Sequence, residues 1–125
     1  MKLFILLSAI STLILSVKDC SMKKNVPGKY KGRLEIKGIC SNYTIKLLEG
    51  NIDTSKIAAI WTDEVTNKSY TNVFALSRPC RFPKNIEQGD EFYFTIDTSA
   101  EKGCIVCMAY YPTPPKKLPI RVIEK

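Results

Sequence analysis

Residues 89–96 read Gly-Asp-Glu-Phe-Tyr-Phe-Thr-Ile, and this stretch decides the fold class. Phe92, Phe94 and Ile96 occupy every second position, so their large apolar side chains fall on one face of an extended chain. Alternation of this kind predicts a β-strand with one face in a core. The Gly-Asp pair in front of it supplies a turn.

Other alternating or apolar runs lie along the chain, and none keeps the 3.6-residue period of a helix over three turns. Strands are expected over 33–40, 43–47, 70–76 and 118–122, with Asn67-Lys68 at a hairpin tip. Ile57–Trp61 fits either a short strand or one helical turn. Cys104–Tyr111 is apolar on both parities, as expected for a strand covered on both faces.

About six short strands with turn residues between them predict an all-β fold, a single small barrel or sandwich. An OB-like barrel is the first candidate, because such barrels contain about five strands of this length. This is an analogy of fold and predicts no function. The length of 125 residues suits one such domain, expected over 33–125 after a linker at 21–32.

The N-terminus has the pattern of a secretion signal. Met1-Lys2 precedes an uncharged apolar run from Leu3 to Val17. This run suits a signal peptide and is shorter than the about 20 residues of a membrane-spanning helix. We therefore expect residues 1–20 to be a signal peptide, with a buried helix as the alternative. The domain would then be exported to the periplasm, the outer envelope or the medium.

Cys20 lies three residues beyond the apolar run, where bacterial lipoproteins carry the cysteine that becomes acylated after cleavage. The preceding residues depart from that pattern. Val17, Lys18 and Asp19 stand where a Leu-like residue and small residues are usual. Cys20 is thus a lipidation candidate and a candidate membrane tether, and ordinary cleavage near Ser16 is the alternative.

The other four cysteines are Cys40, Cys80, Cys104 and Cys107, and an exported domain predicts two disulfides among them. In an extended strand, residues three apart have Cα atoms roughly 10 Å apart, whereas a disulfide needs less than about 7 Å. Cys104 and Cys107 are therefore expected to bond separately to Cys40 and Cys80. A turn at Gly103-Cys104 would instead allow a local bridge.

The spacing of Cys104 and Cys107 also occurs in redox and zinc proteins. A redox motif normally begins a helix, whose dipole lowers a thiol pKa, and this one lies in a strand-like run. A zinc knuckle needs a second such spacing, which Cys40 and Cys80 do not provide. A thiol-redox or zinc-binding protein using Cys104 and Cys107 is therefore kept as an alternative function. We expect no cofactor.

The composition limits the class of partner. The chain has 19 Lys and Arg, 12 Asp and Glu and no histidine, and no basic run exceeds two residues. Such scattered charge is typical of an ordinary soluble surface, so a nucleic-acid partner is not expected. A second alternative is a surface that binds sugar or an anionic polymer by stacking, unless the aromatic residues fill the core. Its candidates are Trp61, Tyr93, Tyr110 and Tyr111.

No phosphate loop, nucleophile elbow or metalloprotease motif occurs in the sequence, so no catalytic residue is assigned. The leading hypothesis is an exported, non-enzymatic β domain of the cell envelope. It would bind an unknown protein or envelope component, or serve structurally.

Six stretches carry a resemblance to known proteins: Gly38–Tyr43, Trp61–Glu64, Asn72–Leu76, Pro79-Cys80, Gly89–Phe92 and Cys104–Tyr110. Together they resemble small predicted secreted or lipid-anchored proteins of Bacteroidetes-type bacteria. The resemblance spans nearly all of residues 33–125. It implies export, and it brings neither an activity nor a site residue.

Overall fold

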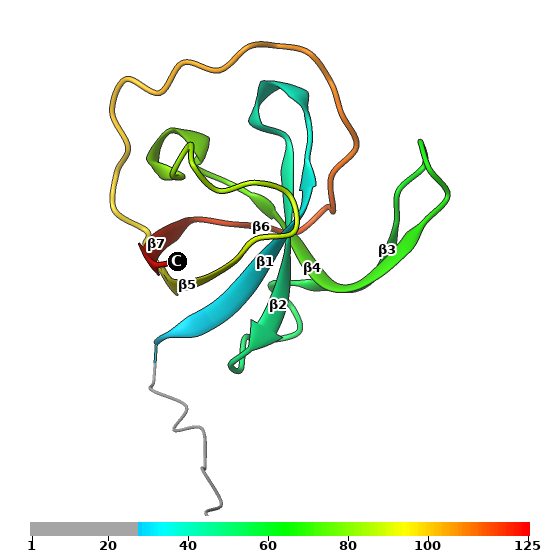
Figure 1. Ribbon diagram of the computed structural model, residues 1–125, viewed down its shortest axis with the longest axis horizontal. Coiled ribbons are helices and arrows are strands. Elements are labelled where there is room, and N and C mark those ends of the chain that lie inside the picture. Colours follow the sequence, from blue (N-terminus) through cyan, green and yellow to red (C-terminus); the bar gives the residue numbers. More distant parts are fainter. Residues whose placement is uncertain (1–27) are drawn as a thin grey trace, which may run out of the picture.

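The computed structural model describes residues 28–125, which form seven strands and two short 3-10 turns (Figure 1). In chain order they are β1 (Tyr30–Lys37), η1 (Ile39–Ser41), β2 (Tyr43–Glu49), β3 (Ala58–Thr62), β4 (Ser69–Leu76), η2 (Pro79–Arg81), β5 (Glu91–Ile96), β6 (Lys117–Leu118) and β7 (Ile120–Glu124). The expected signal peptide, Cys20 and most of the expected linker lie outside the described residues. Within 28–125, no helix has the length and hydropathy that crossing a membrane requires.

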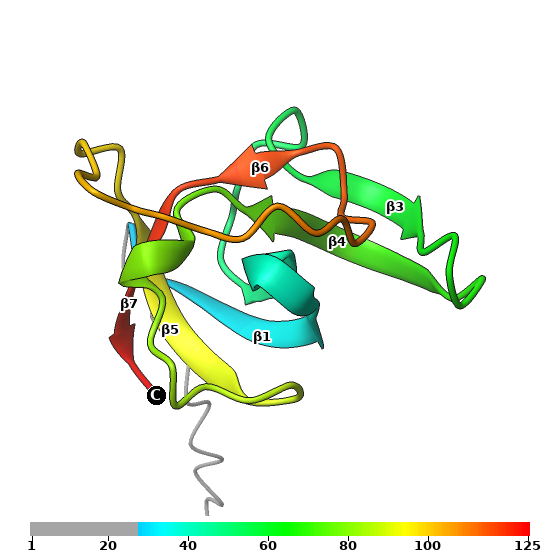
Figure 2. The same cartoon turned by 90° about the horizontal axis from the view of Figure 1, so that it is seen from above.

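Hydrogen bonds join the strands into one antiparallel sheet in the order β3-β4-β2-β1-β5-β7. β6 pairs in parallel with β4, and only Pro119 separates it from β7, which pairs with β5. The path of pairings therefore returns to β4, and the sheet curls into a small, partly open barrel (Figure 2). This confirms the all-β prediction, and a partly open small barrel is the architecture of OB-like folds.

Large apolar side chains from opposite strands fill the barrel. Burial alternates on β5 as predicted, with Phe92 at 1% and Phe94 at 0% exposure and Tyr93 between them partly exposed. The ring of Phe94 contacts that of Phe74 on β4, with centroids 5.8 Å apart. Burying each such side chain stabilises the fold by about 1.5–3 kcal/mol. Other core residues are Leu34, Ile45, Ile52, Ile57, Leu76, Phe82, Ile86, Leu118 and Ile120.

One predicted strand is wrong. Cys104–Tyr111 is not a strand, and no long strand lies between β5 and the two-residue β6. A run that is apolar on both parities predicts a strand covered on both faces. Here Ile105 and Met108 are 92% and 96% exposed instead, because disulfides and side-chain bonds hold the segment in place without burial.

Other boundaries differ from the expectation in smaller ways. The strand expected over 33–40 ends at Lys37, and Cys40 lies in η1. β1 begins at Tyr30, inside the expected linker, because Tyr30 and the residues after it pair with β5. The ambiguous segment at 57–61 forms the strand β3, and the hairpin to β4 turns at Asn67 as predicted. Pro119 divides the last strand in two, because it has no N–H group to donate.

Candidate functional site

Residues 97–116, which we call the strap, connect β5 to β6 without a helix or a strand. Figure 1 shows the strap as the yellow-to-orange segment that arches over the connections containing η1 and η2. Loops of this length inside a small domain are usually functional or disordered. This one is fixed at its start, its middle and its end, which makes it the candidate site.

Two disulfides fix the middle of the strap. Cys107 is bonded to Cys40 in η1, and Cys104 is bonded to Cys80 in η2, with Cα–Cα distances of 5.0 and 5.5 Å. The predicted crossed pairing is therefore confirmed, although the segment is not the strand from which it was argued. Because Cys104 and Cys107 have different partners, they do not form a redox pair with each other.

A cluster of charges fixes the start of the strap. The Asp97 carboxylate contacts Arg121 at 2.8 Å and Arg81 at 3.3 Å, and it accepts a hydrogen bond from the Ser99 backbone N–H at 2.9 Å. Arg81 also donates to the Ala100 carbonyl at 2.7 Å. The hydrogen bonds from Ser99, followed by the positive charges of the two arginines, lower the pKa of Asp97.

Two tyrosines fix the end of the strap to the turn between β3 and β4. The Tyr111 hydroxyl donates to Oδ2 of Asp63, and the Tyr110 hydroxyl donates to Oε1 of Glu64, each at 3.1 Å. Burial and the bond to Asp63 raise the pKa of Tyr111, and the bond to Glu64 raises that of Tyr110. No local sequence signal pointed to these acidic partners, since adjacent acids in a turn are usually only solvated.

The backbone of η1 is strained next to its disulfide. Cys40 and Ser41 have φ values of 54° and 60°, in the left-handed region that costs non-glycine residues about 1–2 kcal/mol each. The Asn42 side chain holds this conformation, because its amide donates to the Ile39 carbonyl at 2.8 Å and to the Ala109 carbonyl of the strap at 3.0 Å. Such strain is common at functional sites.

The anchored strap presents an apolar surface that we call the strap face: Ile105, Val106, Met108 and Tyr110, with Ile39 of η1. Their exposed fractions run from 41% for Val106 to 96% for Met108. Isolated exposed apolar residues are ordinary, whereas four of these lie within residues 105–110, on a segment that two disulfides fix. Tyr110 is one of the binding-surface candidates predicted from the sequence, whereas the expected strand predicted burial of Ile105, Val106 and Met108.

A groove of about 550 Å³ lies between η1, η2 and the middle of the strap. Tyr43, Phe82 and Val106 form apolar parts of its lining, and Lys37 and Lys84 contribute positive charge. The Cys80 end of one disulfide also lines it. Ile105 and Val106 of the strap face line the groove as well, so the two surfaces meet at these residues.

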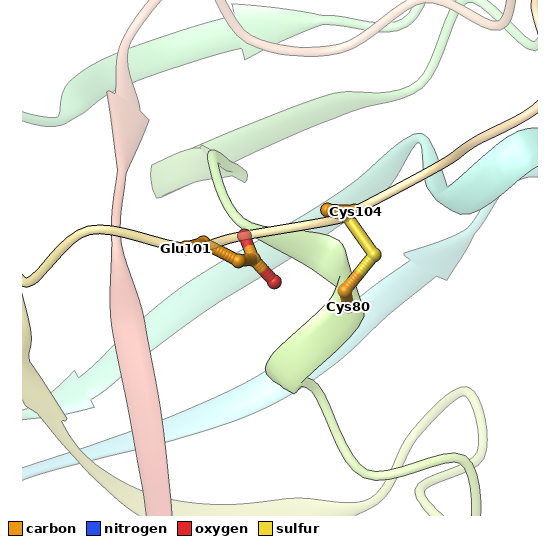
Figure 3. A group of neighbouring side chains, drawn as sticks. All are labelled: Cys80, Glu101 and Cys104. Carbon is orange, nitrogen blue, oxygen red and sulfur yellow. A yellow bond between two sulfur atoms is a disulfide. The ribbon is translucent and has the colours of Figure 1, made fainter.

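Cys80, Cys104 and Glu101 form a cluster whose sulfur and carboxylate atoms lie within 4.8 Å of one another (Figure 3). The two sulfurs are bonded to each other, so they offer no thiolate, which is the form of cysteine that binds zinc. Oε1 of Glu101 is buried and has no hydrogen-bond partner within the described residues. In this oxidised state the cluster anchors the strap rather than presenting metal ligands.

The four aromatic candidates do not form one surface. Tyr110 and Tyr111 meet the turn that follows β3, and Trp61 of β3 stacks on Tyr70, with centroids 5.9 Å apart. Tyr93 lies on β5 instead, where Lys29 and Lys31 approach its ring to 4.5 and 5.6 Å.

No family model matches the sequence, and neither a curated protein nor a solved structure matches it.

Proposed function

We propose that this protein is an exported, non-enzymatic binding module of the cell envelope, and that the strap face contacts a partner protein. One observation carries the proposal. Two disulfides fix a segment whose Ile105, Met108 and Tyr110 side chains are 92%, 96% and 77% exposed. Folding gains little from apolar side chains that stay in water, so their function is expected to lie in contact with another molecule.

The composition of the strap face supports a protein partner. Residues 103–111 contain no charged side chain, in a chain that has 31 charged residues in its 125 positions when the 19 basic and 12 acidic residues are counted together. Centres of protein–protein interfaces are depleted in charge and enriched in Met and aromatic residues. The cross-links also fix the strap before it meets a partner, which reduces the entropy lost on binding.

The position of the strap in the barrel agrees with this proposal. OB-like barrels bind ligands at the loops between strands one and two and between strands four and five. If β3, at the end of the strand order, is left out of the count and β6 and β7 together are taken as the fifth strand, these loops correspond to the connection containing η1 and to the strap. Cys40 and Cys107 join the two. This is an analogy of fold, and it supports the location of the site without identifying the partner.

Export is supported by the two disulfides, because cytosolic reductants keep most thiols reduced. We propose that residues 1–20 direct this export and that Cys20 carries a lipid that tethers the domain. Intact mass spectrometry of the native protein tests both points. We expect loss of the signal, an acyl mass on Cys20 and four cysteines blocked in disulfides. A full-length cytosolic chain with five reactive thiols would contradict the proposal.

Site-specific crosslinking in the native cell envelope tests the strap face. The variant carries Ile105→Asp together with Met108→Asp, and the control carries Ile123→Asp, an exposed apolar residue of β7 outside the strap. We expect the wild type and the control to crosslink the same single partner protein, with the same ratio of partner to domain. The strap variant should no longer crosslink that partner. Equal crosslinking by all three proteins would show that the strap face is not the contact.

A further inference from the structure

The groove beneath the strap has the dimensions of a small-molecule site. Its volume of about 550 Å³ falls within the range of about 300–1,000 Å³ that such sites occupy. Tyr43, Phe82 and Val106 provide apolar lining, so an apolar body placed there would leave water. η1, η2 and the strap each contribute lining residues, and the disulfides join these three segments, so the groove is preformed.

The charges along the groove do not cancel. Lys37 is balanced, because its ammonium group lies 3.1 Å from the Glu87 carboxylate and also donates to the Ile86 carbonyl at 3.1 Å. Lys84 is exposed and has no ion-pair partner among residues 28–125. Among residues 28–125 no acidic side chain lines the groove, and the nearby Glu101 carboxylate lies within 4.8 Å of the Cys80 sulfur. One ammonium group without an ion-pair partner therefore lies beside the apolar part of the lining.

We infer that the groove binds a small organic monoanion, a carboxylate carried on an apolar body, with Lys84 as the partner of the carboxylate. Each half of such a ligand meets its complement, since the apolar body contacts the aromatic lining and the anion contacts the free ammonium group. A neutral apolar ligand would leave Lys84 unused, and a dianion would exceed the single free charge. The groove shares Ile105 and Val106 with the strap face, but the inference rests on Lys84 and the aromatic lining and does not depend on the partner protein proposed for the strap face.

Titration of the oxidised protein with three matched probes tests the ligand class. Decanoate has the apolar body and the anion, decyltrimethylammonium has the body with a positive charge, and acetate has the anion alone. By calorimetry, we expect decanoate to bind at one saturable site, and the other two at least about tenfold more weakly. Amide NMR shifts should concentrate at the residues that line the groove. Equal binding of decanoate and decyltrimethylammonium, or shifts located elsewhere, would overturn the inference.

A pair of lysine variants tests the role of Lys84. Lys84→Gln removes the groove charge, and Lys116→Gln removes the same charge from an exposed position that does not line the groove. We expect decanoate to bind about two- to fivefold more weakly to the first variant and unchanged to the second. Equal effects would show general charge attraction and would refute a specific site. Crosslinking through the strap face should survive Lys84→Gln, which separates this inference from the proposed function.

Discussion

The hydroxyl of Tyr111 donates a hydrogen bond to the Asp63 carboxylate, joining two residues that are 48 positions apart in the chain. Asp63 is only 1% exposed, and its other carboxylate oxygen accepts the Val65 backbone N–H at 2.9 Å. The end of the strap is therefore attached to a buried acceptor in the β3–β4 turn. Neighbouring Tyr110 makes a comparable bond to Glu64, but both of these side chains are exposed.

Removing the Tyr111 hydroxyl should destabilise the protein. In Tyr111→Phe the buried Asp63 carboxylate loses a hydrogen-bond donor, and an unsatisfied buried polar group costs about 1–3 kcal/mol. Tyr110→Phe is the matched control, because water can replace the tyrosine at the exposed Glu64. Urea denaturation should show a clear loss of unfolding free energy for Tyr111→Phe and little for Tyr110→Phe. Similar losses in both variants would mean that burial of Asp63 does not matter.

Gly38→Ala should loosen the same end of the strap through steric overlap. A Cβ atom at Gly38 would overlap the Asn42 carbonyl oxygen and approach the Tyr111 ring to 3.1 Å. The φ of Gly38 is −71°, which any residue adopts, so the effect is one of packing alone. Overpacking of this kind costs about 1–3 kcal/mol. Urea denaturation should show this loss, and an unchanged free energy of unfolding would mean that the Asn42 carbonyl and the Tyr111 ring move aside.

Most strands could be predicted because the alternation of apolar and polar residues within each strand indicates which of its faces is buried. Alternation around Phe92 and Phe94 indicated which face of β5 enters the core, and the structure confirms it. The path of the strap could not be predicted in this way. An apolar run such as Ile105-Val106 has the same pattern whether it is covered or is fixed by covalent bonds at the surface.

The anchors of the strap depend on contacts between distant parts of the chain. Nothing local to Asp63 indicates that Tyr111 will reach it, and nothing local to Lys84 indicates a groove. The disulfide pairing was an exception. The separate partners of Cys104 and Cys107 were predicted correctly, but from the spacing of an extended strand that the structure does not contain.

The stabilisation that the Asp97 carboxylate provides at the start of the strap should be lost in acid. The pKa of Asp97 is lowered below its ordinary value of 3.8 in the folded protein. The unfolded chain therefore binds a proton more readily, so this stabilisation is fully present above that value and is lost as pH falls through the lowered pKa. Asp97→Asn should be less stable than the wild type at neutral pH, and the difference should shrink below about pH 4. Denaturation curves across this range measure it, and a difference that does not change with pH would contradict the assignment.

The two disulfides should differ in how much each one stabilises the folded protein. The Cys40–Cys107 bond spans 67 residues and the Cys80–Cys104 bond spans 24. Because a longer closed loop restricts the unfolded chain more, removing each pair by substitution with Ala should cost about 4.4 and about 3.5 kcal/mol respectively. Guanidinium denaturation of the two double variants, each with the other disulfide intact, should rank them in that order.

Trypsin should rank the same two variants in the opposite order. Lys102 is exposed and lies between the Asp97 cluster and Cys104, so the Cys80–Cys104 bond is the nearest constraint on the peptide bond that trypsin cleaves after Lys102. Loss of this disulfide frees that part of the strap, whereas loss of Cys40–Cys107 leaves it attached to η2. Cleavage after Lys102 under native conditions should therefore be faster in the Cys80/Cys104 variant, although this variant is the more stable of the two. Mass spectrometry of the digest measures the rate of cleavage. If the Cys40/Cys107 variant were both less stable and cleaved faster, the two bonds would not act on separate parts of the strap.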